Sequence, residues 1–408
     1  MSEPRTVLTD ADIAADAGTG RHVGTVLDTR PGRRPRPAAL LAVAVAALLL
    51  VAPLYLDGSW LRLGLFAFAA AVAALGLTLL VGQAGQLSLG HSFFVAVGAY
   101  GYTFFAADRG GGGGPSGDGS PGAAAGLGLP PVVALVLAVL LAGAAGWAFS
   151  PIAGRLRGIY LGVASLGLVF GGLHILNNAE PLTGGAHGRD VPAFKLFGVT
   201  FDRVPGEALQ VLGVPFGREE KLWYLAAALL VAAYLYYRNL VRGRPGRALR
   251  AVRDRELMAG IVGVPVARYK AYVFVVSSMY AGLGGVLLAL VLGRVIPEAF
   301  GVALAVEFLA MVVIGGLGSA AGAVAGAAFV VCLPRILDRY AENLPFIASS
   351  SSISESGGLE PAVVAQFAYG AAVIVLLLVE PGGVVAVGNR LRRRLRRTPS
   401  APSHPHQG

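Results

Sequence analysis

The sequence LRLGLFAFAAAVAALGLTLLVGQAGQLSLGHSFFVAVGAYGYTFFAA, residues 61–107, holds two apolar runs separated by a short polar segment. A helix that spans a lipid bilayer needs about 20 mostly apolar residues. The run at 61–81 has that length, and the run at 92–107 is shorter. The polar segment, residues 81–94, carries two glutamines, two serines, a histidine and three glycines. This order predicts two spanning helices that meet at a polar junction.

The rest of the chain repeats this apolar character. Of 408 residues, 55% are hydrophobic and 14% are charged, and the mean hydropathy is +0.67. Soluble domains carry about 25% charged residues, so a soluble protein is excluded. We predict an all-α polytopic membrane protein with about ten transmembrane helices, roughly 8–10, because one run is short and the runs at 300–315 and 319–337 could form one broken unit. The candidate spans are residues 38–56, 61–81, 92–107, 129–149, 156–176, 222–237, 271–292, 300–315, 319–337 and 362–380.

The net charge of +10 is distributed in a way that indicates topology rather than nucleic-acid binding. A polar extension at 1–37 precedes the transmembrane domain at 38–388, and a basic tail follows at 389–408. With ten spans and a cytoplasmic N-terminus, the inside segments hold 23 of the 33 Lys and Arg residues. Cytoplasmic loops of membrane proteins carry such an excess, so both termini are expected in the cytoplasm. The arginines of the tail serve as a topology signal or also contact anionic membrane lipid.

No pattern of residues indicates catalysis or metal binding. The chain has one cysteine, Cys332, which excludes an intramolecular disulfide and a cysteine metal cluster. Only three lysines are present, and none follows a glycine-rich run as a nucleotide-binding loop requires. We therefore expect no catalytic residue, no metal and no cofactor in this chain. If transport is driven by ATP, another chain binds the ATP and Mg and hydrolyses the ATP.

The basic loop, residues 238–270, has nine Lys or Arg residues, more than orientation alone requires. Pro245-Gly246 is expected to break the chain, and residues 247–263 then read as a helix that Gly263 stops. Such a helix either lies on the membrane surface or docks a soluble partner. Small residues at Ala259, Gly260 and Gly263 favour docking, because they permit close backbone approach. The apolar contacts of the helix are assigned to Leu249, Val252, Met258 and Ile261.

The polar segment has two explanations. Irregular backbone within a membrane survives only where it is buried in protein or faces water. Packing alone does not need two amides and an imidazole, so we favour a translocation path or gate at the cytoplasmic end of a helix. Glu307 is added as a carboxylate inside an apolar run, although a helix–helix hydrogen bond explains it equally well. The candidate path residues are Gly82, Gln83, Gly85, Gln86, Ser88, Gly90, His91 and Glu307.

A second glycine cluster, VVIGGLGSAAGAVAGAA, occupies residues 312–328. Paired glycine-interrupted segments point to a binding site in some transporters, but the two clusters do not match the register of a five-plus-five repeat. Close packing of helices through small residues is the better explanation here. The packing candidates are Gly315, Gly316, Gly318, Gly322 and Gly326.

Four stretches together resemble a known family, the membrane permease subunits of branched-chain amino acid ABC importers, of the LivM type. They are LGLTLLVGQAGQLSLGHSFFVAVGAY (75–100), GRALRAVRDRELMAGIVGVPVARYKAYVF (246–274), FLAMVVIGGLGSAAGAVAGA (308–327) and YGAAVIVLLLVEPGGVVAVG (369–388). The resemblance implies a pore-forming subunit of the bacterial plasma membrane. It also implies a second homologous permease, two ATPase subunits and an extracytoplasmic substrate-binding protein as partners.

The resemblance implies that the basic loop carries the helix that couples the permease to the ATPase. The family's alanine pair and glycine fall on Met258, Ala259 and Gly263, and Met258 departs from the usual alanine. The substrate is expected to be a branched-chain or related amino acid, with urea or short amides as the alternative. A secondary transporter or channel acting alone is disfavoured by the few charges within the spans. The coupling residues implied are Arg253, Asp254, Glu256, Met258, Ala259 and Gly263.

Overall fold

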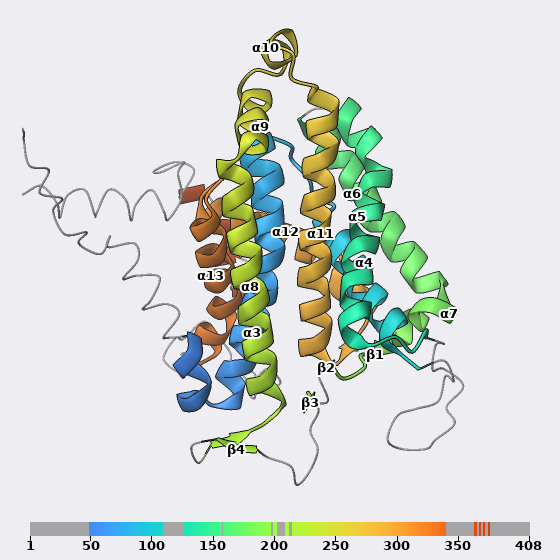
Figure 1. Ribbon diagram of the computed structural model, residues 1–408, viewed down its shortest axis with the longest axis vertical. Helices are drawn as coiled ribbons and strands as arrows, with labels where there is room; N and C mark the ends of the chain where they lie inside the picture. The colour runs from blue at the N-terminus through green and yellow to red at the C-terminus, as the bar shows by residue number, and fades with distance from the viewer. Residues whose placement is uncertain are drawn as a thin grey trace, which may run out of the picture. The chain divides into compact units, whose positions relative to one another are not determined.

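The structure is a computed structural model in which the chain is helical over most of its described length (Figure 1). The predicted N-terminal extension and basic tail lie outside the described residues, as do residues 109–125 and 340–362. The described residues are 49–108, 126–156, 158–196, 199–201, 209–211, 214–339 and the pairs 363–364, 367–368, 370–371 and 374–375.

Six helices of the described part are long and apolar enough to cross a membrane, which confirms the helical, polytopic class in outline. Two shorter apolar helices, α4 (His91–Ala106) and α13 (Ala320–Arg339), coincide with further predicted spans. The predicted spans at 38–56 and 362–380 lie largely outside the described residues. The six are α3 (Gly58–Leu77) with its π-helical extension η2 (Thr78–Gln83), α5 (Pro131–Arg155), α6 (Ile159–Asn178), α8 (Arg218–Arg242), α11 (Val266–Leu292), and the 3₁₀ turn η4 (Pro297–Phe300) with α12 (Val302–Gly315).

Helices α3 and α11 form the centre of the bundle. In the most apolar stretch of each helix, 78% of the residues of α3 and 72% of those of α11 are buried, whereas in α5 and in α6 only 28% are buried. Glycines let α4 approach α11 at backbone distance, since a Cβ at Gly98 would overlap the backbone of Gly282, and one at Gly285 would overlap the carbonyl of Val95. In a membrane the hydrophobic effect does not drive helices together, because lipid is as apolar as their side chains. Close packing through small residues stabilises their association instead.

The basic loop and the short strands lie at opposite ends of the bundle (Figure 1). At the end of the bundle that carries the strands, residues 189–190 pair with residues 294–295. The ten-span topology predicts both of these segments on the same side of the membrane. The strand pairs are all antiparallel and two or three residues long, and α7 (Glu180–Thr183) and a 3₁₀ turn, η3 (Gly185–His187), precede them. They are β1 (Arg189–Asp190) with β6 (Arg294–Val295), β2 (Lys195–Leu196) with β3 (Val199–Thr200), and β4 (Leu209–Val211) with β5 (Val214–Phe216).

Arg189, in strand β1, connects the strands at this end of the bundle to the neighbouring helices. Its guanidinium donates a hydrogen bond to the carbonyl of Leu182 at 2.8 Å and lies 5.8 Å from the ring centre of Phe104 on α4. Burial lowers the pKa of Arg189 from its usual range. The segment after α6 is therefore packed against the bundle, as an ordered cap.

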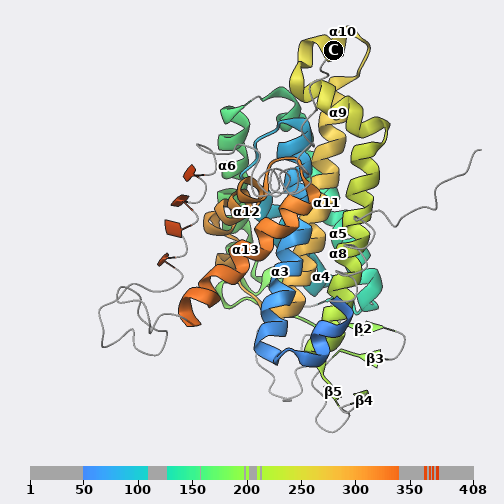
Figure 2. The same cartoon turned by 90° about the vertical axis from the view of Figure 1, so that its left-hand side faces the viewer.

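The predicted single helix at 247–263 is wrong in its bounds, because the basic loop contains two helices. Helix α9 (Arg244–Asp254) begins before the expected break, since proline in a first turn has no N–H that needs a partner. Arg255 then adopts an extended conformation (φ −151°, ψ 92°), and a short helix, α10 (Glu256–Ile261), follows. Figure 2 shows α10 beyond α9 at the end of the bundle.

Candidate functional site

The two glycine clusters, far apart in the sequence, meet in the structure. Helix α3 ends in the π-helical turn η2, and the wider turn presents the backbone of Gly82 to the loop between α12 and α13. A Cβ at Gly82 would overlap the backbone of Gly318. The side chain of Gln83 donates from Nε2 to the carbonyl of Gly318 at 2.9 Å. We call this contact the Gly82–Gly318 junction. π-helical turns often occur at functional sites.

The basic loop also reaches this junction. Arg253, in the last turn of α9, donates a hydrogen bond from Nη1 to the carbonyl of Gly82. Gly85 adopts a positive φ of 67°, and a Cβ there would lie 3.1 Å from Cγ of Arg253. Glycine is favoured at such a backbone conformation. Gly82 is therefore in contact with the loop through its carbonyl and with Gly318 through its Cα.

Several groups of the polar segment are hydrogen-bonded to groups on other helices, whereas the Oγ of the buried Ser92 has no hydrogen-bond partner among the described residues. Gln86 donates from Nε2 to the carbonyl of Ala153 on α5 at 3.3 Å. His91 donates from Nε2 to the carbonyl of Ala73 on α3 at 2.8 Å. The backbone N–H of Leu89 donates to Oγ of Ser165 on α6 at 2.8 Å. In this conformation the segment joins three helices together.

Ser88 and Gly90 complete the polar segment. The Oγ of Ser88 accepts a hydrogen bond from the N–H of Gly90 at 3.3 Å, and Ser88 is 2% exposed. A Cβ at Gly90 would lie 3.0 Å from the carbonyl oxygen of Ser165. Gln83, Gln86 and His91 are at most 5% exposed. None of these side chains faces bulk water here.

The second glycine cluster forms a tight hairpin of two helices. The backbones of Gly315 and Gly322 touch, and a Cβ at Gly326 would overlap the carbonyl of Met311, so α12 and α13 pack through glycine. Gly318, which packs against Gly82, lies with Gly316 in the turn between the helices. Both have positive φ, 104° and 85°.

Glu307, on α12, lies apart from the Gly82–Gly318 junction. It lines a pocket of about 290 Å³ with residues of α3, α4, α11, α12 and α13. Among the described residues no hydrogen bond or ion pair to its carboxylate is found. The helix–helix hydrogen bond considered for this carboxylate is therefore absent from the described part of the chain.

Helix α10 presents an apolar surface at the end of the bundle. Leu257, Met258, Ile261 and Val262 are 75%, 51%, 79% and 80% exposed, whereas Ala259 is 4% exposed. Of the four residues to which the apolar contacts are assigned, Leu249 and Val252 are buried within the chain, whereas Met258 and Ile261 are exposed. The break at Arg255 turns α10 so that its apolar side chains point away from the bundle. We call these four residues the α10 surface.

Two coupling candidates make contacts within the chain, while Asp254 is exposed in the last turn of α9. Glu256 pairs with Nζ of Lys270 on α11 at 2.7 Å, and the Lys270 side chain is 6% exposed. Gly263 has a φ of 86°, with nothing within 4 Å of the position of a Cβ. Arg253 and Glu256 thus attach the loop to the bundle.

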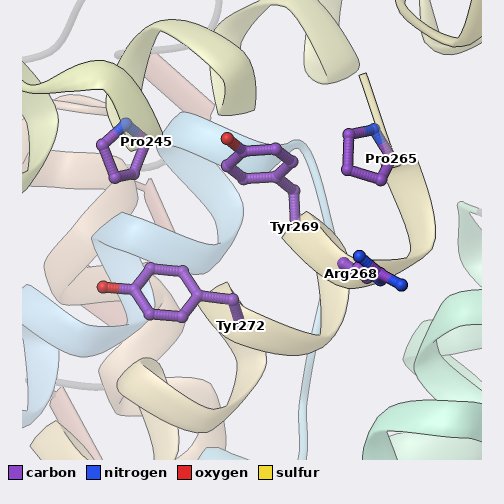
Figure 3. Close-up of a pocket in the computed structure, with 5 residues that line it drawn as sticks. All are labelled: Pro245, Pro265, Arg268, Tyr269 and Tyr272. Atoms are coloured by element: carbon purple, nitrogen blue, oxygen red, sulfur yellow. The ribbon is translucent and has the colours of Figure 1, made fainter. Parts of the chain in front are cut away.

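A hollow of about 300 Å³ is lined by residues of the basic loop and by Tyr272 of α11, and no local feature of the sequence indicates it. Figure 3 shows Tyr269 and Tyr272, from the start of α11, with Pro245 of α9 on one side and Pro265 and Arg268 on the other. The hollow therefore lies between the first turn of α9 and the start of α11.

Comparison with known proteins places the chain among transport proteins. The family model described as the permease component of the branched-chain amino acid transport system matches residues 59–380. The chain belongs to this family. The match includes every helix from α3 to α13, and with them the Gly82–Gly318 junction and the α10 surface. No solved structure matches the chain.

Curated members of the permease family are similar over part of their length. The high-affinity branched-chain amino acid transport system permease protein LivM of Salmonella typhimurium is 35% identical over 272 residues, which are 64% of this chain and 59% of the relative. The same protein of Escherichia coli is 35% identical over 61% of this chain and 56% of the relative. LivH of Salmonella typhimurium is 28% identical over 46% of this chain and 59% of the relative. The chain thus spans somewhat more than half the length of its LivM relatives.

One tyrosine of this permease-family chain lies at the Gly82–Gly318 junction, although it was not predicted from the sequence as a site residue. Tyr237, on α8, donates from its hydroxyl to the carbonyl of Gly318 at 3.3 Å and is 2% exposed. A tyrosine inside an apolar run needs a partner for its hydroxyl, which is the signal that could have found it. Helices α3, α8 and α9 and the α12–α13 turn therefore all converge on this junction.

Proposed function

We propose that the chain is the membrane-spanning permease subunit of an ATP-driven importer of branched-chain or related amino acids. A separate extracytoplasmic binding protein delivers the substrate, and a second homologous permease completes the pore. Two ATPase chains bind and hydrolyse the ATP with Mg, so this chain supplies neither a catalytic residue nor a cofactor. The printed names of the LivM and LivH relatives support the substrate class and the pairing of two permeases.

The observation that carries the proposal is the α10 surface. Soluble proteins rarely leave large apolar side chains exposed together, and such patches mark sites of protein or membrane interaction. Three of these side chains lie on the six-residue helix α10 and the fourth, Val262, follows it directly, at the extreme end of the bundle (Figure 1). The nine basic and two acidic residues of the basic loop favour the cytoplasmic side. A cytoplasmic ATPase that accepts this apolar helix in a groove fits both features.

The contacts of α9 provide a route from the ATPase to the spans. A movement of α10 is transmitted to α9 across a single extended residue, Arg255. Arg253 then acts on the carbonyl of Gly82 at the end of α3, and Gly82 acts on Gly318. Both contacts involve the backbone, so a shift of the loop moves helix ends and not only side chains. Because Arg253 is the side chain that joins α9 to Gly82 on this route, its loss should interrupt the transmission of movement from the ATPase to the spans.

The polar segment serves as the inner gate, held here in a closed conformation. The side chains of Gln83, Gln86 and His91 hold α3 and α5 together with the α12–α13 turn through hydrogen bonds to carbonyls. When the gate opens, the same amides and imidazole become a polar lining without fixed charge. Such a lining lets a zwitterionic amino acid pass without trapping it by a strong ion pair.

The finer topology belongs to the same proposal: ten spans in the bacterial plasma membrane, with both termini cytoplasmic. The basic loop and residues 153–155 share one end of the bundle with the junction, which supports this assignment. Reporter fusions after residue 113 and after residue 397 are expected to report outside and inside, respectively. A fusion after residue 113 that reports inside would contradict the topology.

Reconstitution tests the function itself. The chain is expressed with candidate ATPase and second-permease subunits of the same organism and placed in proteoliposomes, with a candidate binding protein outside. ATP-dependent accumulation of leucine is expected, and no accumulation without ATP. Accumulation of urea in place of leucine would transfer the chain to the amide importers. Leucine uptake by this chain alone, without ATP, would overturn the proposal.

A further inference from the structure

The pocket that contains Glu307 combines one carboxylate with apolar walls. Leu288 of α11, Leu304 of α12 and Val331 of α13 are among its lining residues, and every other lining residue is apolar or glycine. Its volume of about 290 Å³ lies near the lower limit of small-molecule sites, which are roughly 300–1,000 Å³. The pocket suits a small, mostly aliphatic ligand.

The carboxylate has no described partner, although it lies within a helix predicted to span the membrane. A charge in such a position is costly and is ordinarily paired or exposed to a water-filled space. Glu307 is half-buried, and the described pocket walls offer it neither a cation nor a hydrogen-bond donor. The partner that suits the Glu307 carboxylate is therefore a cation that does not belong to the described residues. An ammonium group on an aliphatic ligand supplies that cation and fills the apolar walls.

The pocket lies well away from the basic loop. Ala70 lines it and stands on the same continuous helix as Gly82, twelve residues earlier, which corresponds to a rise of roughly 18 Å. The Gly82–Gly318 junction thus lies between the pocket and the α10 surface. A ligand in the pocket is on the far side of the proposed closed gate, where an imported substrate waits.

We propose that this pocket binds the ammonium group and the branched aliphatic side chain of the transported amino acid, with Glu307 as the partner of the ammonium. The inference rests on the proposed function and assigns a substrate contact within it. The described lining residues include no cation for the carboxylate of the amino acid, so the pocket is assigned only the ammonium end and the side chain. Glu307 is then a specificity residue for amino acids over urea, which has no ammonium.

Binding of two small probes tests this site directly. Isoamylamine has the ammonium and branched chain of leucine without the carboxylate, and isoamyl alcohol has nearly the same shape without the charge. Their affinities are measured by calorimetry on the full transporter complex in lipid nanodiscs, without binding protein. We expect preference for the amine. Glu307→Gln should lower amine affinity at least about tenfold and leave alcohol affinity unchanged, because only a charge-assisted contact is lost.

Two further variants control for damage to the fold. Glu307→Asp keeps the charge and should retain the preference for the amine. Ala70→Leu keeps Glu307 but fills the pocket, and should weaken both probes. Equal affinity of the wild-type complex for amine and alcohol would overturn the inference, as would unchanged amine binding by Glu307→Gln. If that variant does not assemble, undiminished binding by Ala70→Leu overturns it.

Leucine uptake by the same purified wild-type complex, reconstituted into proteoliposomes with the binding protein outside, separates this inference from the proposed function. A complex that imports leucine but shows no amine preference in the pocket refutes only the role of Glu307. A complex that imports no leucine refutes the proposed function.

Discussion

The guanidinium of Arg253 is hydrogen-bonded to the carbonyl oxygen of Gly82. These residues are 171 positions apart, and one belongs to the basic loop while the other ends α3. Hydrogen bonds that involve an ionised group are roughly twice as strong as neutral ones. The contact therefore makes a firm connection between a surface loop and the most buried helix of the described bundle.

The absence of a side chain at Gly82 is required by the approach of Gly318. Gly82→Ala is expected to force the two backbones apart and to cost about 1–3 kcal/mol, as overpacking does in a core. Thermal unfolding of the purified protein should show the loss, and transport should fall. Gly167→Ala is the matched control on α6, because nothing lies within 4 Å of a Cβ there. Equal stability of the two variants would show that the junction is loose.

The α10 surface should fail to bind the ATPase when a charge is placed in it. Ile261, 79% exposed, offers apolar area that the proposed ATPase would remove from water on docking. Ile261→Asp is expected to abolish co-purification of the ATPase while the permease still inserts and folds. Ile261→Val preserves the apolar character and should retain the partner. Normal co-purification by the aspartate variant would place the docking site elsewhere.

The pair of Glu256 and Lys270 should hold α10 to α11. Glu256→Gln removes this carboxylate from a lysine whose side chain is 6% exposed, at an expected cost of about 1–3 kcal/mol. Amide hydrogen exchange should become faster in residues 256–265. The exchanged pair, Glu256→Lys with Lys270→Glu, tests the contact itself and should restore slow exchange. No recovery in that double variant would mean that the pair does not hold the loop.

Substitutions at Gly263 separate the effect of backbone strain from the effect of side-chain contacts within the chain. Its φ of 86° strains any residue with a Cβ, and asparagine tolerates this region better than most. Gly263→Asn is expected to retain partial transport. Gly263→Trp meets open space in the described structure, so its failure would come from the strained backbone and from a clash with the docked ATPase. If Gly263→Trp binds the ATPase and transports normally, the loop is not the coupling element.

The positions of the helices were largely predictable from the sequence, because a long apolar run is a local property. The predicted spans from 61–81 to 319–337 all coincide with described helices. The π-helical turn at Thr78–Gln83 has no such local signal, since its residues read as a continuation of the run. The break at Arg255 was missed for a similar reason: no proline or glycine stands there.

The convergence of candidate residues was not predictable from the sequence. Gly82 and Gly318 were recognised separately, but their contact depends on how α3 and the α12–α13 hairpin pack, which one sequence does not encode at short range. The same holds for Arg253, whose charge suggested an exposed docking residue before its bond to Gly82 was known. Glu307 was identified by type alone, and only the fold places it in a pocket.

The central claim is that Arg253 transmits movement of the basic loop to the inner gate, and Arg253→Met tests it most directly. Methionine keeps much of the apolar stem but cannot donate to the carbonyl of Gly82. Arg250→Met on the same helix is the control, because Arg250 is exposed like Arg253 but makes no side-chain hydrogen bond to another described residue. Leucine uptake and ATP hydrolysis are measured together in proteoliposomes that contain the complete importer.

The result predicted for Arg253→Met is uncoupling, in which ATP hydrolysis continues near the wild-type rate while leucine uptake falls at least about tenfold, as loss of a charge-assisted hydrogen bond implies. Arg250→Met should match the wild type in both. An Arg253→Met importer that moves as much leucine per ATP as the wild type would contradict the account.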